Sequence, residues 1–302
     1  MLKNLASRIK DLKQKHEAVI LVHSYQRPEV QELGDFIGDS LGLCIAASKT
    51  DAKLIVFCGV HFMAESAKLL NPKKTVLLPE KEAGCPMADM ASAERLTSMK
   101  KEHPGAIVVS YVNTTAAVKA ESDICCTSSN AVKVIESIPP DKKIIFVPDR
   151  HLGRYIVEKT GREMILWPGF CPVHQRILPQ NIMEKKRHYP DAVVVVHPES
   201  SKDVIEQADV VGSTEFIYKY CINSKERVFI IGTEEGILYR LRKANPEKTF
   251  VPASDLTVCK NMKLTTLESV FYSMDRMEHV IEIDPEIAER AITPLQRMLQ
   301  IR

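Results

Sequence analysis

The runs AVILVHSY (18–25), AIVVSYVN (106–113) and AVVVVHPE (192–199) decide the fold of this chain. Each is short, rich in β-branched residues and apolar on both faces, which is typical of a central strand in a parallel sheet covered by helices. A second signal follows each run at a constant distance: GDFIGDS (34–40), SDICCTS (122–128) and ADVVGST (208–214). The chain therefore repeats with a period of roughly 87 residues, far longer than a solenoid unit.

Each repeat also contains a second apolar run (KLIVFCGV, KIIFVPDR, RVFIIGTE) followed by a helical stretch. This alternation predicts an α/β fold of three homologous small parallel-sheet α/β domains around a pseudo-threefold axis. The expected domains are residues 1–85, 86–171 and 172–259. Residues 264–302 have no counterpart in the other repeats, and we expect the segment 260–302 to complete the first domain.

Composition excludes several classes of protein. Of the 302 residues, 45% are hydrophobic and 26% charged, as in ordinary globular proteins. A net charge of +2 gives no reason to expect nucleic acid or an acidic membrane surface as a partner. The apolar runs have the length of strands, and the N-terminus has the pattern of an amphipathic helix rather than a signal peptide. We therefore expect a cytoplasmic protein with no membrane or nucleic-acid partner.

Three of the eight cysteines follow the repeat. Cys85, Cys171 and Cys259 lie 86 and 88 residues apart, each in a loop after a short β-like run. Three related domains around one axis would bring these thiols to a common point. Three thiolates at one point suit a metal or iron–sulfur centre with an open coordination position. The remaining cysteines lie in apolar helix or strand contexts and are interpreted as core residues.

Polar residues close the first strand of every repeat, where ligands of such sheets bind. The three pairs are His23 with Tyr25, Tyr111 with Asn113, and His197 with Glu199. Duplication would have copied one residue type if the role were structural. Instead the polarity is kept and the chemistry differs, which favours one shared site with a different task for each copy.

Three hydroxyl residues also recur at one offset: Ser40, Ser128 and Thr214. Each ends a short polar turn before a helical segment, so each is predicted to be an N-cap. Free backbone N–H groups and the helix dipole at such positions would attract carboxylates or a phosphate. Simple helix capping explains the same pattern.

Taken together, the motifs resemble the quinolinate synthase family over essentially the whole chain. They are HSYQxPEVQ (23–31), GDS (38–40), GCPMA (84–88), YVNT (111–114), CTSSNAV (126–132), PDRHLG (148–153), CPVHQ (171–175), HPE (197–199), GST (212–214), IGTEEG (231–236) and VCKNMK (258–263). One departure is Ser24, where the family usually has Asn between the His and the Tyr. That side chain should point away from the site.

The resemblance implies a transferase-type condensing and dehydrating enzyme of de novo NAD (pyridine nucleotide) biosynthesis. Its substrates would be iminosuccinate (iminoaspartate) and dihydroxyacetone phosphate, and its products quinolinate, phosphate and water. It also implies one 4Fe-4S cluster per chain, held by Cys85, Cys171 and Cys259, whose fourth iron has no protein ligand and serves as a Lewis acid. A functional link to an aspartate-oxidising enzyme that supplies iminosuccinate is a further expectation.

The same resemblance assigns roles to individual residues. Tyr25 and Glu199 are expected to transfer protons. The implied substrate ligands are His23, Ser40, Tyr111, Val112, Asn113, Ser128, His174, His197, Pro198, Glu199 and Thr214.

Two other functions fit three converging thiolates. One is a zinc-dependent hydrolase with a three-cysteine metal site and a bound water. The other is a redox sensor without catalytic activity.

Overall fold

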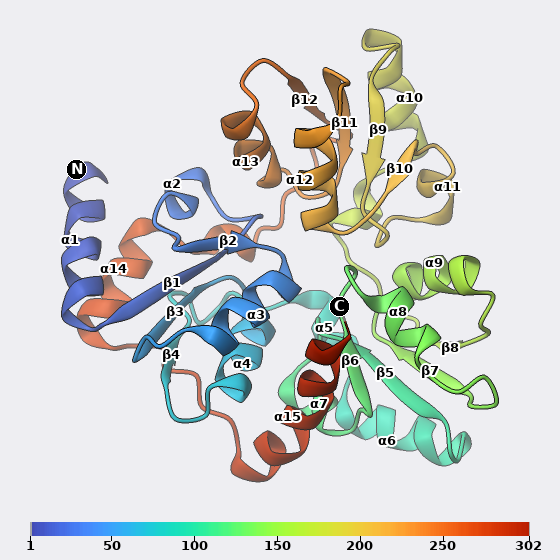
Figure 1. The fold of residues 1–302 in the computed structure, drawn as a ribbon, viewed down its shortest axis with the longest axis horizontal. Coiled ribbons are helices and arrows are strands. Elements are labelled where there is room, and N and C mark those ends of the chain that lie inside the picture. Colours follow the sequence, from blue (N-terminus) through green and yellow to red (C-terminus); the bar gives the residue numbers. More distant parts are fainter. Residues whose placement is uncertain (1, 302) are drawn as a thin grey trace.

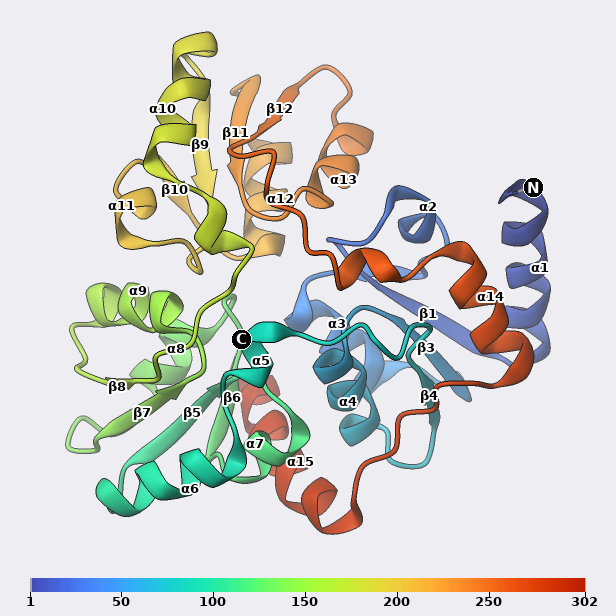
Figure 2. The ribbon, with the colours of Figure 1, turned by 180° about the vertical axis from the view of Figure 1, so that it is seen from behind.

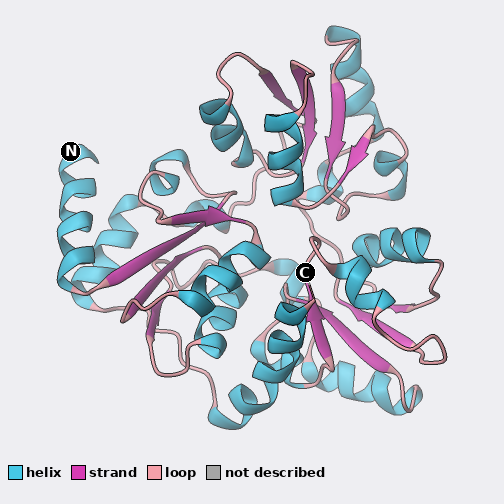
Figure 3. Ribbon diagram, in the orientation of Figure 1, coloured by secondary structure: helices cyan, strands magenta, loops and turns pink. Residues whose placement is uncertain are grey.

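The computed structural model describes residues 2–301 and contains three four-stranded sheets arranged around a common centre (Figure 1). All strand pairs are parallel. The strand orders are β2-β1-β3-β4, β6-β5-β7-β8 and β10-β9-β11-β12, so each sheet places its second strand at one edge and its first strand beside it. Helices cover both faces of each sheet (Figure 3). The predicted α/β fold with three similar units is confirmed.

The elements of the first unit are α1 (Leu2–Lys15), β1 (Ala18–His23), α2 (Pro28–Gln31), β2 (Phe36–Gly38), α3 (Ser40–Lys49), β3 (Leu54–Cys58), α4 (His61–Leu70), β4 (Thr75–Leu77) and α5 (Pro86–Asp89). Those of the second unit are α6 (Ala93–Glu102), β5 (Ile107–Tyr111), α7 (Ala116–Ala120), β6 (Ile124–Cys126), α8 (Ala131–Glu136), β7 (Ile144–Val147), α9 (Arg150–Thr160), β8 (Ile165–Leu166) and the 3₁₀ turn η1 (His174–Arg176). Those of the third unit are α10 (Pro179–His188), β9 (Val193–Val196), α11 (Lys202–Ile205), β10 (Val210–Val211), α12 (Thr214–Asn223), β11 (Val228–Gly232), α13 (Ile237–Ala244), β12 (Thr249–Pro252) and η2 (Met262–Leu264).

An aspartate that recurs with the repeat extends the pairing of the first two strands in every unit. Its carboxylate accepts a hydrogen bond from a backbone N–H of the first strand, just before the second strand begins. The pairs are Asp35 with Ile20 (2.9 Å), Asp123 with Val108 (2.7 Å) and Asp209 with Val194 (2.8 Å). Each aspartate therefore satisfies a backbone donor that would otherwise lack a partner.

The apolar runs form the core, as their composition demands. Every residue of β1 is buried, and equivalent residues of the three first strands, Leu21, Val109 and Val195, belong to one continuous cluster of buried side chains. The cluster passes through all three units. The carboxyl ends of the strands are thereby held close to the centre of the molecule.

The C-terminal segment divides between two units. Helix α14 (Leu267–Arg276) packs against α1 and β3 of the first unit. Before α15 (Pro285–Gln300), Val280 forms a single antiparallel bridge with Leu77 at the edge of the first sheet. Helix α15 then packs mainly on α7 and β6 of the second unit, because its apolar stripe of Ala291, Leu295 and Met298 is buried there. Only part of the segment expected to complete the first domain lies there, and the domain boundaries themselves stay a prediction.

Candidate active site

A cavity of about 220 Å³ lies where the three units meet. Residues from all three units line it, at the carboxyl ends of the strands, as expected for parallel α/β sheets. Seen from behind, α5, which directly follows Cys85, lies close to this centre (Figure 2). Among the described residues, no helix has the length and hydropathy needed to cross a membrane.

Nearly all the residues selected from the sequence line this cavity. They are His23, Tyr25, Ser40, Cys85, Tyr111, Asn113, Ser128, Cys171, His174, His197, Glu199, Thr214 and Cys259. Val112 and Pro198 are buried but are not part of the cavity wall. The backbone N–H of Val112 already donates to Cys126 O in the neighbouring strand, at 2.9 Å.

The three cysteines share one local structure. Each precedes a short helical turn: Cys85 lies before α5, Cys171 before η1 and Cys259 before η2. All three side chains are partly accessible, whereas the five other cysteines are buried. This difference is what a ligand set requires, because a core thiol has no room for a metal.

Burial keeps the three thiols protonated unless a cation is present. It raises the pKa of Cys85 to about 12, and it also raises the pKa of Cys171 and Cys259. The neighbouring thiol Cys259 adds to the rise at Cys85, and Cys85 adds to the rise at Cys171. Backbone hydrogen bonds from each following turn act in the opposite direction. A bound metal centre would supply the positive charge that thiolates need here.

A continuous line of hydrogen bonds begins at Tyr25. Its hydroxyl lies 2.7 Å from Thr214 Oγ1 and 2.6 Å from Thr233 Oγ1. Thr233 Oγ1 in turn lies 2.8 Å from His174 Nε2. Burial, followed by the charge of Glu199, raises the pKa of Tyr25 well above its usual value. The tyrosine is therefore a neutral group with partners on both sides.

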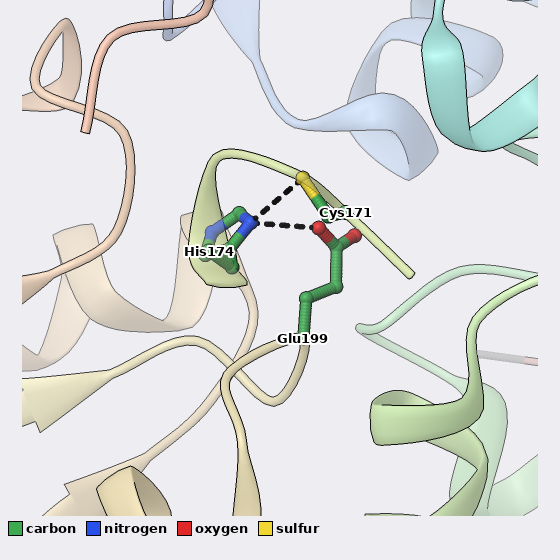
Figure 4. A group of neighbouring side chains, drawn as sticks. All are labelled: Cys171, His174 and Glu199. Carbon is green, nitrogen blue, oxygen red and sulfur yellow. Dashed lines mark hydrogen bonds and ion pairs between the residues drawn. The ribbon is translucent and has the colours of Figure 1, made fainter. Parts of the chain in front are cut away.

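The line continues from His174 to Glu199 (Figure 4). His174 Nδ1 lies 2.9 Å from Glu199 Oε2 and 3.2 Å from Cys171 Sγ. Tyr111 donates to Glu199 Oε1 at 2.5 Å. Burial alone would raise the pKa of Glu199, but the His174 and His197 rings and the hydrogen bonds from His174 and Tyr111 outweigh it and hold the pKa below its usual range.

Cys171, His174 and Glu199 have the proximity of a metal site, since one ligand atom from each lies within 4.8 Å of the others. Both ring nitrogens of His174, however, already have hydrogen-bond partners. A metal on this imidazole would break one of those bonds. We therefore interpret His174 as a link between the thiol and the polar network rather than as a ligand.

His23 and His197 are equivalent in structure as well as in sequence. In each, Nδ1 accepts a hydrogen bond from the backbone N–H two residues later, that of Tyr25 (3.2 Å) or Glu199 (3.3 Å). Burial lowers the pKa of both rings to about 3. Each ring is therefore neutral and carries its proton on Nε2. The Nε2 atom of His197 lies 3.1 Å from Ser128 Oγ.

The prediction that Ser40, Ser128 and Thr214 are N-caps is wrong by one or two residues. The capping residues are Asp39 for α3, Asn130 for α8 and Ser213 for α12. Ser40 and Thr214 are instead the first residues of their helices. Their hydroxyls are not used for capping and line the cavity.

Hydrogen bonds between side chains of all three units lie next to these hydroxyls. Ser129 Oγ, from the second unit, donates to Asp39 Oδ2 of the first at 2.6 Å. It also lies 2.8 Å from Ser213 Oγ of the third, which can donate to it in return.

Several residues of the site were not selected from the sequence. They are Asp39, Thr127, Arg176, Thr233, Glu234, Lys260, Asn261 and Lys263. All of them except Arg176 lie inside motifs that were noted, namely GDS, CTSSNAV, IGTEEG and VCKNMK. Several of these residues make their contacts with residues of other repeats. The motifs alone therefore could not indicate what each of them does in the site.

Comparison with known proteins shows the family of this chain. A family model described as quinolinate synthetase A protein matches residues 7–300. A quinolinate synthase of Desulforudis audaxviator is 55% identical over 98% of this chain and 98% of its own length. That of Geobacter sp. (strain M21) is also 55% identical, over 98% of this chain and 97% of its own. A solved structure, the E-1-hydroxy-2-methyl-but-2-enyl-4-diphosphate reductase of Plasmodium falciparum, is 16% identical over 92% of this chain and 95% of that one, with a TM-score of 0.35, too low to support a conclusion.

The family match spans nearly the full length, so all three units and the cavity between them fall within it. The chain therefore belongs to the quinolinate synthetase A family of enzymes.

Proposed function

We propose that this chain condenses iminosuccinate with dihydroxyacetone phosphate to give quinolinate, phosphate and water. The observation that carries the proposal is the convergence of three repeat-related cysteines and a polar network of differentiated residues on one cavity. The full-length similarity to quinolinate synthases supports it. Iminosuccinate would come from an enzyme that oxidises aspartate.

The thiols of Cys85, Cys171 and Cys259 fit a 4Fe-4S cluster with one iron free of protein ligands. They share one cavity wall, are partly accessible, and each receives backbone hydrogen bonds from its own turn. Such a cluster, when bound, would supply a Lewis acid for the loss of a substrate hydroxyl as water. A zinc-dependent hydrolase is not favoured, because the full-length similarity is to quinolinate synthases.

The chain offers neutral hydrogen-bond donors for an anionic substrate. The Nε2–H groups of His23 and His197 and the hydroxyls of Ser40, Ser128 and Thr214 line the cavity. We infer that they bind the carboxylates of iminosuccinate and the phosphate of the second substrate. Asn113 Oδ1 is buried with no partner among the described residues, so it is poised to accept a hydrogen bond from a substrate amine or hydroxyl.

Proton transfer is assigned to Tyr25 and Glu199. Burial raises the pKa of Tyr25 well above its usual value, so a free phenolate is unfavourable here. When the phenol gives a proton to the substrate, we expect it to take another from its hydrogen-bond partner in the same step. The path through Thr233 and His174 to Glu199 has no gap longer than 2.9 Å. Enolisation and dehydration each need a base and an acid in turn, and this line can act as both.

Anaerobic reconstitution tests the proposal. We expect a brown protein with about four iron and four sulfide per chain that forms quinolinate from the two substrates. Replacing Cys85, Cys171 or Cys259 in turn by Ser should abolish quinolinate formation, whereas Cys221→Ala, at a buried cysteine of α12, should not. Colourless protein with one zinc would indicate the hydrolase. A cluster-loaded protein without turnover, and with a spectrum unchanged by quinolinate, would indicate a redox sensor.

A further inference from the structure

Lys263 lies where the loop of the third cysteine meets the residues after β1. Its Nζ donates to the carbonyl oxygen of Tyr25 at 2.5 Å and lies 2.9 Å from Glu234 Oε1. Its backbone is also fixed, since its N–H donates to Cys259 O at 3.1 Å and its carbonyl accepts from Arg27 Nε at 2.7 Å. One residue thus contacts both the cysteine loop and the loop of Tyr25.

Glu234 makes the other half of this link. Its Oε1 accepts from the backbone N–H of Cys259 at 3.0 Å, and its Oε2 accepts from that of Gly236 at 2.7 Å. The side chain is only 1% exposed, and that of Lys263 is 13% exposed. The ammonium therefore compensates a buried carboxylate that fixes the backbone of a cysteine.

The space around the ammonium leaves it little freedom. A Cβ added to Gly236 would lie 2.6 Å from Tyr25 O and 2.8 Å from Lys263 Nζ. No side chain could therefore be placed on Gly236 without displacing one or both of these groups. Lys263 is bonded both to Cys259 O, through its N–H, and to Tyr25 O, through its Nζ, so a displacement of the Cys259 loop is expected to reach the carbonyl of Tyr25.

We propose that Lys263 is a positioning residue that transmits the placement of the Cys259 loop to Tyr25. Occupation of the cysteine site then orders the loop of Tyr25 and sets its hydroxyl between Thr214 and Thr233. The inference rests on the proposed function, because it gives Tyr25 and Cys259 the roles assigned above.

Hydrogen exchange in apo and cluster-loaded protein tests this link. The amides of Tyr25 and Gln26 are bonded to His23, so their exchange reports the order of that loop. In the unchanged protein, loading should slow exchange at 24–27 and at 259–262 together, by about ten-fold. In Lys263→Met the slowing at 24–27 should be lost while that at 259–262 remains, and kcat should fall by about ten-fold with little change in KM.

Two further variants keep the test decisive. Gly236→Ala retains both charges, but its methyl group would lie 2.6 Å from Tyr25 O and 2.8 Å from Lys263 Nζ, so these groups must shift and their hydrogen bond should be weakened. This variant should therefore uncouple the segments even if Lys263→Met loses its cluster. Lys248→Met removes a lysine that binds three carbonyls near the end of α12, Cys221 O, Ile222 O and Ser224 O, and should leave the coupling intact.

Coupling that persists in both Lys263→Met and Gly236→Ala would overturn the inference. Coupled segments in an unchanged protein that makes no quinolinate would refute only the proposed function. The role of Lys263 would then remain supported, because hydrogen exchange does not depend on turnover.

Discussion

The three equivalent strand ends carry two histidines and one tyrosine, and the tyrosine makes a different contact from the histidines. His23 and His197 keep the same bond from Nδ1 to the backbone N–H two residues on. Tyr111 occupies the third equivalent position and instead donates to Glu199 of another unit. The duplicated position has therefore become two neutral imidazoles and one phenol that face a shared cavity.

Glu199→Gln should retain the cluster absorption yet lose turnover by about 100-fold or more, because the amide cannot accept the proton that arrives through His174. Initial rates of quinolinate formation by protein of equal iron content would measure this. Glu206→Gln, at an exposed glutamate after α11, is the matched control. Near-normal turnover in Glu199→Gln would remove this residue from the mechanism.

The buried imidazoles of His23 and His197 predict a loss of stability in mild acid. Burial lowers the pKa of both to about 3, whereas in the unfolded chain they titrate near 6.5. The unfolded state therefore binds more protons between these values, so stability is complete above about pH 6.5 and falls as the pH drops towards 3. Denaturant unfolding from pH 6.5 to 4 should show a loss that starts at about 0.7 kcal/mol per pH unit for each ring at pH 6.5, where the unfolded ring is half protonated, and approaches about 1.4 kcal/mol per pH unit below pH 5.5.

His197→Gln should remove the share of that slope that belongs to one ring. His188→Gln, at an exposed histidine of α10, should leave the slope unchanged. An unchanged slope in His197→Gln would mean that this ring is charged in the folded protein as well.

At the scale of elements, the sequence predicted the strands well and the helix starts less well. The strands could be predicted because runs of β-branched residues such as Val193–Val196 are apolar on both faces. Such runs are buried most completely as central strands of a parallel sheet. The N-caps were displaced because Asp39 and Ser40 are both good capping residues, and the choice depends on which side chain reaches Gly42 N. The type of residue at these two positions therefore could not decide which of them is the cap.

Thr233 shows why part of the site escaped prediction. A threonine at the end of a strand is ordinary, and its role arises only because Tyr25, 208 residues away, places its hydroxyl against it. The cysteines, by contrast, could be selected because their spacing follows the period of the repeat. Helix α15 illustrates the same limit, since its amphipathic pattern specifies a buried stripe but not the unit that buries it.

At the scale of the whole molecule, the site exists only while the three units stay together. Cys85, Cys171 and Cys259 come from one loop of each unit, and the proton path runs from Tyr25 in the first unit to Glu199 in the third. The core shared by the units holds them broadly in place. The spacing of the substrate hydroxyls, however, depends on the polar contacts nearest to them.

Ser129→Ala should therefore weaken quinolinate binding without loss of the cluster. The Ser129 hydroxyl is bonded to Asp39 and to Ser213, the residues immediately before Ser40 and Thr214. Without this hydroxyl, the first turns of α3 and α12 are no longer linked and can separate. Because the bond to Asp39 is charge-assisted but Ser129 itself is exposed, we expect a rise in Kd of about ten-fold. Titration of quinolinate into cluster-loaded protein would measure it. Ser129→Thr should restore binding. Ser137→Ala should not change it, because the Ser137 hydroxyl, as far as the described residues show, bonds only to Val134 O of its own unit. Equal affinity in Ser129→Ala and Ser137→Ala would show that the shared core alone fixes the spacing of the hydroxyls.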